Sequence, residues 1–430
     1  MIASVVEDRL MPPWHPAEDG PRFRDVRRLE DADLDMLVRW LDGGMPEGVG
    51  ELVPPTFPDG FQLGEPDLVV EMAGSFEVPA GGPDIYRNFV IPLGFAEDRY
   101  VTAIELQPTS RTTVHHVLYH LDESGEARRR DGQDGRAGFS GMAGVDRREA
   151  FGGWAVGQSA RHLPEGFAVK VPAGADLVLS THFHPSGKVE REKTRVALHF
   201  ADEPPERTFQ MFMLPPLYGA LSGIDIPPGD SEYELEDTFV LPVAVEIHHV
   251  WAHAHMLCSV VEADATRPDG AVVPLLQIPR WDFNWQERYE LAEPVVLEAG
   301  TRVRVRIVYD NSTSNPSNPF DPPQRVRFGR ETTDEMGAVV FGGALAREGD
   351  LPELSRALTA HARGVATAAA ANRPGRANAR LLDGLRRLDR DGDGVVQLRD
   401  VPPRYRDLFR TLDADGDGRL RIEDIERRES

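Results

Sequence analysis

Residues 301–310 read TRVRVRIVYD, and this stretch decides the fold class. Val303, Val305 and Ile307 alternate with arginines, which is typical of a β-strand with one buried face and one face in water. Comparable short runs recur between about residues 61 and 345, separated by Gly, Pro, Asp and Asn; they include DLVVEM, YVTAIELQP, VHHVLYHL, DLVLSTHFH and TRVALHF. Long helical patterns are absent from this region. The sequence therefore predicts a mainly β protein built of antiparallel sandwiches.

The chain has 430 residues, which is too many for one ordinary hydrophobic core. We expect two successive β-sandwich domains, joined near the segment ERTFQMFMLPPLYG. Before them, DADLDMLVRWLD predicts one short helix that Gly43 and Gly44 end. The predicted divisions are an N-terminal segment over 1–60, β-domains over 61–205 and 206–345, a linker over 346–378 and a small α-helical unit over 379–430.

Composition excludes several classes of protein. A net charge of -23 leaves no basic face for nucleic acid, and no apolar run is long enough to span a bilayer. The single cysteine, Cys258, excludes internal disulfides and sites built on several thiolates, so histidine, carboxylate and methionine remain as metal ligands. The first residues lack the pattern of a secretory signal, so we expect either an intracellular protein or a start that lies upstream.

Two twelve-residue segments near the C-terminus match the calcium loop of an EF-hand: DRDGDGVVQLRD at 389–400 and DADGDGRLRIED at 413–424. Each has glycine at its sixth position for the sharp turn, and Asp in place of the usual Glu at its twelfth. The alternative is an acidic, solvated loop. The predicted calcium ligands are Asp389, Asp391, Asp393, Val395, Gln397 and Asp400 in the first loop, and Asp413, Asp415, Asp417, Arg419 and Asp424 in the second.

Three groups of histidines lie on predicted strands. Residues 248–257 read HHVWAHAHML, where His253 and His255 share one strand face, with His249 nominally on the same face. His182 and His184 have the same spacing, whereas the adjacent His115 and His116 can converge on a metal only where a strand is bulged or ends. The alternative for each group is a structural or surface role, which we assign to His120, His162, His199, His248 and His361.

The kind of metal depends on how soft the ligand atoms are. Imidazole suits zinc and copper alike, but a thioether ligand selects Cu(I). Whether a methionine joins the histidines cannot be read from spacing.

Six segments, in this order, resemble the copper type II, ascorbate-dependent monooxygenases, the group of peptidylglycine alpha-hydroxylating and dopamine beta-monooxygenases, and especially their bacterial relatives. The segments are VHHVLYHLDESG, FGGWAVGQ, GADLVLSTHFHPSGK, WAHAHML, WDFNWQERYEL and YDNSTSNPSNPFDPPQRVRFGRETTDEMG. The resemblance implies two jelly-roll-like β-domains, each with one copper. It implies that His115, His116 and His182 hold an electron-transfer copper, and that His253, His255 and Met336 hold the catalytic copper that binds dioxygen.

The same resemblance implies hydroxylation of a small organic or peptide substrate by dioxygen, with ascorbate or another external electron donor, in a periplasmic or extracellular setting. Met256 is predicted to point away from His253 and His255. The sequence departs from the family at AHAHM, at Ser180 and in its lack of disulfides. Residues 1–60 resemble the end of a c-type cytochrome module, but the chain has no Cys-x-x-Cys-His motif, so we expect no haem.

Two other functions compete with the monooxygenase. A non-catalytic copper- and calcium-binding module for storage, adhesion or partner docking would use the same ligands without oxygen chemistry. A zinc hydrolase is disfavoured because no His-Glu-x-x-His arrangement is present and Met336 would have no role.

Overall fold

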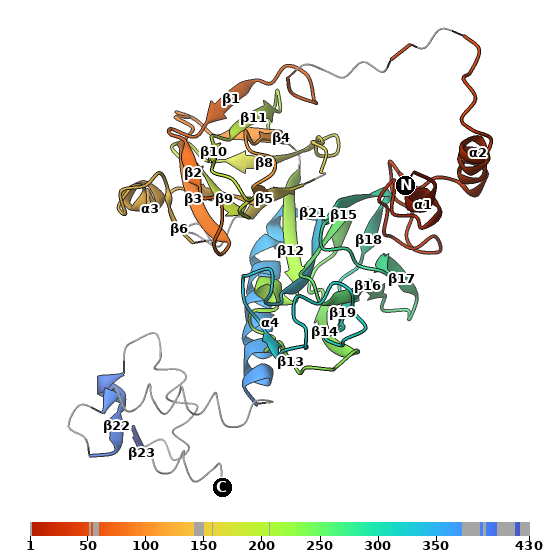
Figure 1. The fold of residues 1–430 in the computed structure, drawn as a ribbon. Helices are drawn as coiled ribbons and strands as arrows, with labels where there is room; N and C mark the ends of the chain where they lie inside the picture. Colours follow the sequence, from red (N-terminus) through yellow and green to blue (C-terminus); the bar gives the residue numbers. More distant parts are fainter. Residues whose placement is uncertain are drawn as a thin grey trace. The chain divides into compact units, whose positions relative to one another are not determined.

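The computed structural model shows a mainly β protein with predominantly antiparallel sheets, as the sequence predicts (Figure 1). It describes residues 2–50, 53–54, 60–141, 150–156, 158–205, 207–371, 388–389, 393–401 and 418–421. The chain forms two compact units. The larger unit contains Met1–Ala220 and Ile224–Thr359, and the smaller contains Leu221–Gly223 and Ala360–Ser430.

An eight-stranded sheet runs through the larger unit. Its neighbouring strands pair antiparallel, except that β8 and β12 pair in parallel through Arg207 and Phe167 and through Thr208 and Ala168. The sheet thus continues across the predicted division at residues 205 and 206. Its strands in order are β1 (Leu68–Glu71), β11 (Arg195–Phe200), β4 (Arg99–Gln107), β8 (Phe167–Val171), β12 (Arg207–Leu214), β21 (Gly337–Leu345), β15 (Val245–Ala254) and β18 (Arg288–Leu297).

Two further sheets complete the β layers of the larger unit. The five-stranded sheet has the order β6 (Phe139–Ser140), β3 (Ile85–Pro92), β9 (Asp176–Phe183), β5 (Val114–Asp122) and β7 (Ala150–Ala155). The four-stranded sheet has the order β14 (Tyr233–Val240), β19 (Arg302–Tyr309), β16 (Cys258–Thr266) and β17 (Val272–Ile278). Two short pairs join β2 (Phe76–Val78) to β10 (Glu190–Glu192), and β13 (Asp225–Ile226) to β20 (Val326–Arg327).

Strand β19 has the two faces that its alternation predicts. Val303, Val305 and Ile307 are fully buried. Arg304 lies on the other face, where its guanidinium donates to Asp264 of β16 at 2.8 Å. The apolar face anchors the core and the polar face forms ion pairs across strands, which is why this segment is a strand of a sandwich-like layer.

Buried apolar side chains form two large cores along the chain. One lies in residues 60–205, called the first lobe, and contains Phe76, Phe89 and Phe183. The other lies in residues 207–359, called the second lobe, and contains Phe341 and Tyr309. The finer assignment of each lobe to a jelly-roll-like domain, with the predicted boundaries, stays a prediction.

Part of the N-terminal segment belongs to the second lobe. Phe23 forms a β-bridge with Leu291 of β18 and joins its core. Trp14 packs edge-on against Tyr289, with ring centroids 5.3 Å apart. Residues 22–24 therefore extend the edge of the eight-stranded sheet beside β18.

Helices are few among the described residues. The helix predicted after residue 30 is α2 (Asp31–Asp42), which ends directly before Gly43 and buries none of its side chains. The Ala-rich stretch after the β region forms α4 (Leu351–Ala371), and none of the described helices is long and apolar enough to cross a membrane. The remaining helical segments are α1 (Ile2–Glu7), α3 (Glu126–Arg130), η1 (Pro216–Gly219), η2 (Glu348–Asp350) and η3 (Leu398–Asp400).

The smaller unit is described in part. Its strands β22 (Val395–Gln397) and β23 (Arg419–Arg421) pair antiparallel, with Val396 opposite Leu420. The helices expected of an EF-hand pair are not shown, because the segments that would contain them lie outside the described residues.

Because strand β21 is closely packed, we expect a single methyl group added at Gly343 to destabilise the fold strongly. A Cβ at Gly343 would lie 1.9 Å from the Glu246 carbonyl oxygen, whereas a Cβ at Gly349 would meet nothing within 4 Å. We expect Gly343→Ala to lower the free energy of unfolding by roughly 1–3 kcal/mol or more, because backbone must move. Gly349→Ala should leave it within about 0.5 kcal/mol of the parent protein. Chemical denaturation of the two variants measures both, and equal stabilities would contradict this packing.

Candidate metal centre

The adjacent His115 and His116 converge because strand β5 is bulged. The pairing of β5 with β9 shifts register between Val114 and His116. A regular strand would send neighbouring side chains to opposite faces, but here the two Nδ1 atoms lie 3.1 Å apart. The strand is therefore bulged at the place where these two adjacent histidines need a bulge in order to approach one metal.

His182 completes a group of three. It lies opposite His116 on the neighbouring strand β9, and its Nδ1 is 3.3 Å from the Nδ1 of His116. Each of His115, His116 and His182 offers a ring nitrogen, and these atoms all lie within 4.8 Å of one another. Three nitrogens bound tetrahedrally to one ion at 2.0–2.1 Å would be about 3.3 Å apart, so this spacing suits a metal held by three imidazoles.

Asp84 fixes the orientation of His182. The Nε2 of His182 lies 2.9 Å from one Asp84 oxygen, and the Nδ1 of the exposed His184 lies 2.7 Å from the other. Burial alone would raise the pKa of Asp84, but its hydrogen bonds to the two histidines outweigh burial and bring the pKa down to about 2. The ionised carboxylate accepts a hydrogen bond from the Nε2–H of His182, which leaves the Nδ1 lone pair of His182 facing His116.

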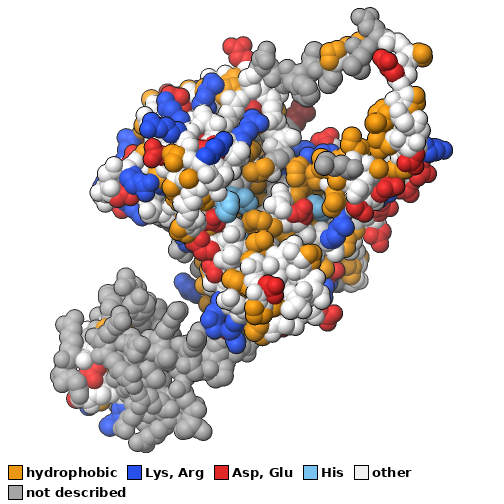
Figure 2. All heavy atoms as spheres, viewed as in Figure 1, with side chains coloured by type: hydrophobic (Ala, Val, Ile, Leu, Met, Phe, Trp, Pro, Cys, Tyr) orange, Lys and Arg blue, Asp and Glu red, His pale blue; other side chains and the backbone are white. Residues whose placement is uncertain are grey.

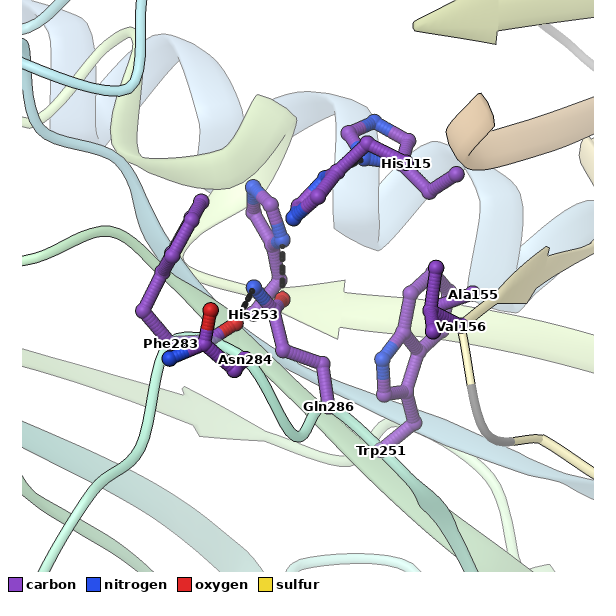
Figure 3. Close-up of a pocket in the computed structure, with 9 residues that line it drawn as sticks. His115, Ala155, Val156, Trp251, His253, Phe283, Asn284 and Gln286 are labelled. Atoms are coloured by element: carbon purple, nitrogen blue, oxygen red, sulfur yellow. Dashed lines mark hydrogen bonds between the residues drawn. The ribbon is translucent and has the colours of Figure 1, made fainter. Parts of the chain in front are cut away.

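His253 is oriented by an amide. Its Nδ1 lies 2.6 Å from Oε1 of Gln286, whose Nε2 donates to the carbonyl oxygens of Phe283 at 3.0 Å and Ala254 at 3.3 Å. Since the amide nitrogen is the donor in those two bonds, its oxygen must accept from His253. The Nδ1 of His253 therefore carries the proton and Nε2 keeps its lone pair; Figure 3 marks the hydrogen bond to Gln286 with a dashed line.

His255 and Met336 lie side by side at the end of a strand pair. Ala254 of β15 pairs with Gly337 of β21, so His255 and Met336 are the next residues in that register. One Glu335 oxygen accepts from the backbone N–H of both, at 3.0 Å from His255 and 3.2 Å from Met336. The Nδ1 of His255 donates to the Asp334 carbonyl at 3.1 Å, which leaves its Nε2 lone pair available to a metal.

The two groups of histidines lie close together within the larger unit. The rings of His116 and His253 are 5.8 Å apart between centroids, and those of His253 and His255 are 5.3 Å apart. Phe283 stacks on His115 with centroids 4.9 Å apart and meets His255 edge-on at 6.0 Å. Histidine side chains reach the surface on the face seen in Figure 2.

A small hollow of about 20 Å³ separates the two groups, enough for roughly one water-sized molecule (Figure 3). Apolar and aromatic side chains form much of its wall, and Asn284 and Gln286 add polar atoms. Its lining residues are His115, His116, Ala155, Val156, Trp251, His253, Phe283, Asn284 and Gln286.

Burial keeps four of these histidines neutral: His115, His116, His253 and His255. It lowers the pKa of His115 to about 3 and that of His253 to about 4. Burial also brings the pKa values of His116 and His255 well below the ordinary value, with neighbouring histidines adding to the effect. Neutral imidazoles carry the lone pair that a metal needs, so these four side chains are ready ligands at neutral pH.

The remaining histidines of the quoted segment contact other groups. The Nε2 of His248 lies 2.7 Å from a Glu246 oxygen. His249 stacks on Phe209 with ring centroids 5.3 Å apart and packs so tightly that a Cβ at Gly342 would lie 2.1 Å from its Nε2. Neither belongs to the group formed by His253 and His255.

The predicted calcium loops are described at a few residues. Gly394 and Gly418, the sixth residues of the two loops, have φ angles of 77° and 76°, as the sharp turn requires. The backbone N–H of Gly394 donates to Asp389 at 2.9 Å, and that of Val395 donates to Asp393 at 2.8 Å. Gln397 and Arg419 lie opposite each other in the β22–β23 pair. Asp391, Asp413, Asp415, Asp417 and Asp424 lie outside the described residues, as does the side chain of Asp400.

Several residues that orient the candidate ligands were missed by sequence reasoning. Asp84 lies in GGPDIY, which carries no motif. Gln286 lies in WDFNWQERYEL, a segment quoted for the family resemblance, but no spacing rule connects it to His253. Glu335 directly precedes Met336, and its role appears only when β15 and β21 are placed side by side.

No protein-family model matches the chain, and no curated protein is similar to it in sequence. Solved structures with partial similarity include that of the infectious bursal disease virus Gx strain, at 8% identity and a TM-score of 0.17, covering 69% of this chain and 80% of that one. PBCV-1 VP54, fitted into a reconstruction of the virophage Sputnik, matches at 6% identity and a TM-score of 0.23, covering 68% and 95%. Paenibacillus xanthan lyase matches at 11% identity and a TM-score of 0.17, covering 62% and 23%. Similarity this low supports no inference about function.

The buried histidines predict acid sensitivity of the metal-free protein. Above pH 6.5 the histidines are neutral in both the folded and the unfolded chain, so they add no pH dependence. As pH falls from about 6.5 to 4, the unfolded chain takes up protons that the folded site refuses, and stability declines. For His253, with a pKa of about 4, the loss at pH 4 is on the order of 3 kcal/mol.

Denaturation of the metal-free protein between pH 4 and 8 measures this loss. His253→Gln, which cannot take a proton in this range, should show a shallower decline with falling pH than the parent protein. Identical pH profiles for the two proteins would contradict the assigned burial.

Proposed function

We propose that this protein is a copper-dependent monooxygenase that hydroxylates an organic substrate with dioxygen and an external reductant such as ascorbate. In this proposal each lobe is a jelly-roll-like β-domain with one copper. The observation that carries it is the pairing of two ligand groups: three imidazole nitrogens within 4.8 Å of one another, and a second histidine pair whose nearest ring lies 5.8 Å from the first group.

The donor sets fit copper. The first group offers three imidazoles, which bind copper in both oxidation states and suit electron transfer. The second offers the two imidazoles of His253 and His255, with the Met336 backbone held next to His255 by Glu335. A thioether beside two imidazoles favours Cu(I) over zinc, and hard ions such as Mg²⁺ prefer oxygen donors.

The chain supplies the orientation of the ligands and the wall of the small hollow between them. Asp84 holds His182 with its Nδ1 lone pair toward His116, and Gln286 holds His253 with its Nε2 lone pair free. Phe283 and Trp251 wall the hollow between the groups, where the available volume suits a molecule as small as dioxygen. Bound copper would supply one-electron redox chemistry and the activation of dioxygen.

Two one-electron metal sites and an external donor fit the electron count of the reaction. Converting a C–H bond and dioxygen to an alcohol and water consumes two electrons and two protons beyond the substrate. His115, His116 and His182 would hold the metal that receives electrons one at a time from the external reductant. His253, His255 and Met336 would hold the metal at which oxygen and substrate meet. An external reductant accords with a periplasmic or extracellular location.

The C-terminal unit would bind calcium. Support comes from the positive φ of Gly394 and Gly418 and from the Asp389 and Asp393 side chains, which accept backbone N–H groups of the first loop. In this proposal the carbonyl oxygens of Val395 and Arg419 and the side chain of Gln397 add ligands to the aspartates. Pairing of β22 with β23 would link the two loops.

Metal content and one methionine variant test the copper proposal. We expect two coppers per chain at saturation, and Met336→Ala should lower ascorbate-dependent oxygen consumption by on the order of 100-fold while ascorbate still reduces the three-histidine copper. Met256→Ala is the matched control, because this neighbour of His255 is predicted to point away from the site. Oxygen-electrode and copper measurements on the parent and both variants give the result.

Two outcomes would count against the proposal. Fewer than two coppers per chain at saturation would remove it. Two coppers without oxygen consumption coupled to a hydroxylated product would favour the copper- and calcium-binding module for storage, adhesion or docking.

Calcium binding has its own test. Titration calorimetry on the full chain should show two calcium sites. Asp389→Ala should abolish or weaken one of them by roughly 10-fold or more, since it removes the first ligand of the first loop. Asp269→Ala, in a turn of the second lobe, is the matched control. Absence of calcium binding in the parent protein would contradict the assignment of both loops.

A further inference from the structure

Gln158 connects the two lobes beside the histidines. Its backbone N–H donates to the Ala155 carbonyl at 3.0 Å, and its Oε1 accepts from the Ala155 N–H at 3.1 Å. The Nε2 of the same amide then donates to the backbone carbonyl of Gln286, 3.2 Å away in the second lobe. The side chain is thus held by its own lobe and reaches across to the other.

Both ends of this connection touch candidate ligands. Ala155 pairs with His116 across β7 and β5, and the N–H of Val156 donates to the His115 carbonyl at 3.3 Å. At the other end, Gln286 accepts from the Nδ1 of His253 at 2.6 Å. The Gln158 amide therefore joins two residues. One is Ala155, whose backbone pairs with His116 of the first histidine group, and the other is Gln286, which orients His253 of the second group.

The chemistry of the bridge requires an amide. The bond to Ala155 needs an acceptor, and the bond to the Gln286 carbonyl needs a donor, and only a side chain with both satisfies the two together. A glutamate at this position would keep the first bond and lose the second. It would also set a carboxylate against a carbonyl oxygen.

Other contacts also join the lobes, and some of them lie at the histidines, such as the stacking of Phe283 on His115. The β8–β12 pairing joins them through Arg207 and Phe167. Tyr86, which stacks on His182 with centroids 4.5 Å apart, donates to the Arg330 carbonyl. Gln158 is set apart from these because it links His116 to His253, the pair of rings by which the two groups come nearest.

We propose that Gln158 is a positioning residue that sets the separation of the two histidine groups by tying the Ala155 backbone to Gln286. The connection itself does not depend on the bound metal. Its consequence for turnover, a short route for electrons between the groups, rests on the function proposed above.

The first test measures the separation without using copper. Nitroxide labels at Val189→Cys in the first lobe and Val272→Cys in the second would report the distance between lobes by pulsed electron paramagnetic resonance. Both positions are exposed, at 58% and 64%, whereas the native Cys258 is buried. We expect Gln158→Glu to lengthen and broaden the distance distribution. Gln107→Glu is the matched control, since Gln107 also donates to a backbone carbonyl, that of Gly60, within the first lobe.

The second test uses the copper-loaded protein. Gln158→Glu should keep two coppers per chain, weaken the magnetic coupling between the two Cu(II) ions and slow electron transfer between them by roughly 10-fold or more. A merely structural role would alter stability but neither the coupling nor the transfer rate at a constant copper content.

The two proposals fail separately. A label distance distribution that is the same in the parent protein and in Gln158→Glu would overturn the role of Gln158, whatever the copper content. A lengthened distance in a protein that binds no copper would support the role of Gln158 and contradict the copper monooxygenase.

Discussion

The arrangement of the site depends on three imidazole nitrogens that point at one another. The Nδ1 of His116 lies 3.1 Å from that of His115 and 3.3 Å from that of His182. Because the Nε2–H of His182 donates a hydrogen bond to Asp84, the Nδ1 of His182 presents a lone pair. A single N–H on His116 can satisfy only one of its two neighbours, so a buried lone pair is left without a partner unless a cation lies between the rings. The fold holds the three rings in this position.

The strand framework explains how the convergence is maintained. Strands β5 and β9 lie side by side in the five-stranded sheet, and the bulge before His116 turns two consecutive histidines to one site. In the second lobe, β15 and β21 end together, which brings His255 beside Met336. Three of the rings donate to an acceptor: His182 to the Asp84 carboxylate, His253 to the Gln286 amide oxygen, and His255 to the Asp334 carbonyl. In both lobes, therefore, one ring nitrogen of a histidine donates its proton to a fixed acceptor, and the other ring nitrogen keeps the lone pair that a metal would bind.

Local patterns in the sequence predicted what is local in the structure. The alternation around Val305 gave strand β19, and the spacing of His253 and His255 put both rings on one side. His249 shares that nominal face, but the register shift between Ile247 and His249 and the close fit against Gly342 take it into other packing. Periodicity cannot anticipate a bulge, because the extra residue is set by the partner strand.

Contacts between distant parts of the chain could not be predicted from the sequence. Asp84 and His182 are 98 residues apart, and Gln158 and Gln286 are 128 apart. Nothing in the spacing of these residues marks them as partners, and their roles follow only from sheet order. The choice of Met336 and the division of the six predicted ligands into two copper sites came instead from a family resemblance, and both stay predictions.

X-ray absorption at the copper edge of the reduced, copper-loaded protein tests the central claim most directly. The account predicts imidazole nitrogens around both coppers and one sulfur scatterer per two coppers, lost in Met336→Ala and retained in Met256→Ala. A spectrum with nitrogen and oxygen scatterers alone, unchanged in Met336→Ala, would contradict the proposed pair of unlike copper sites.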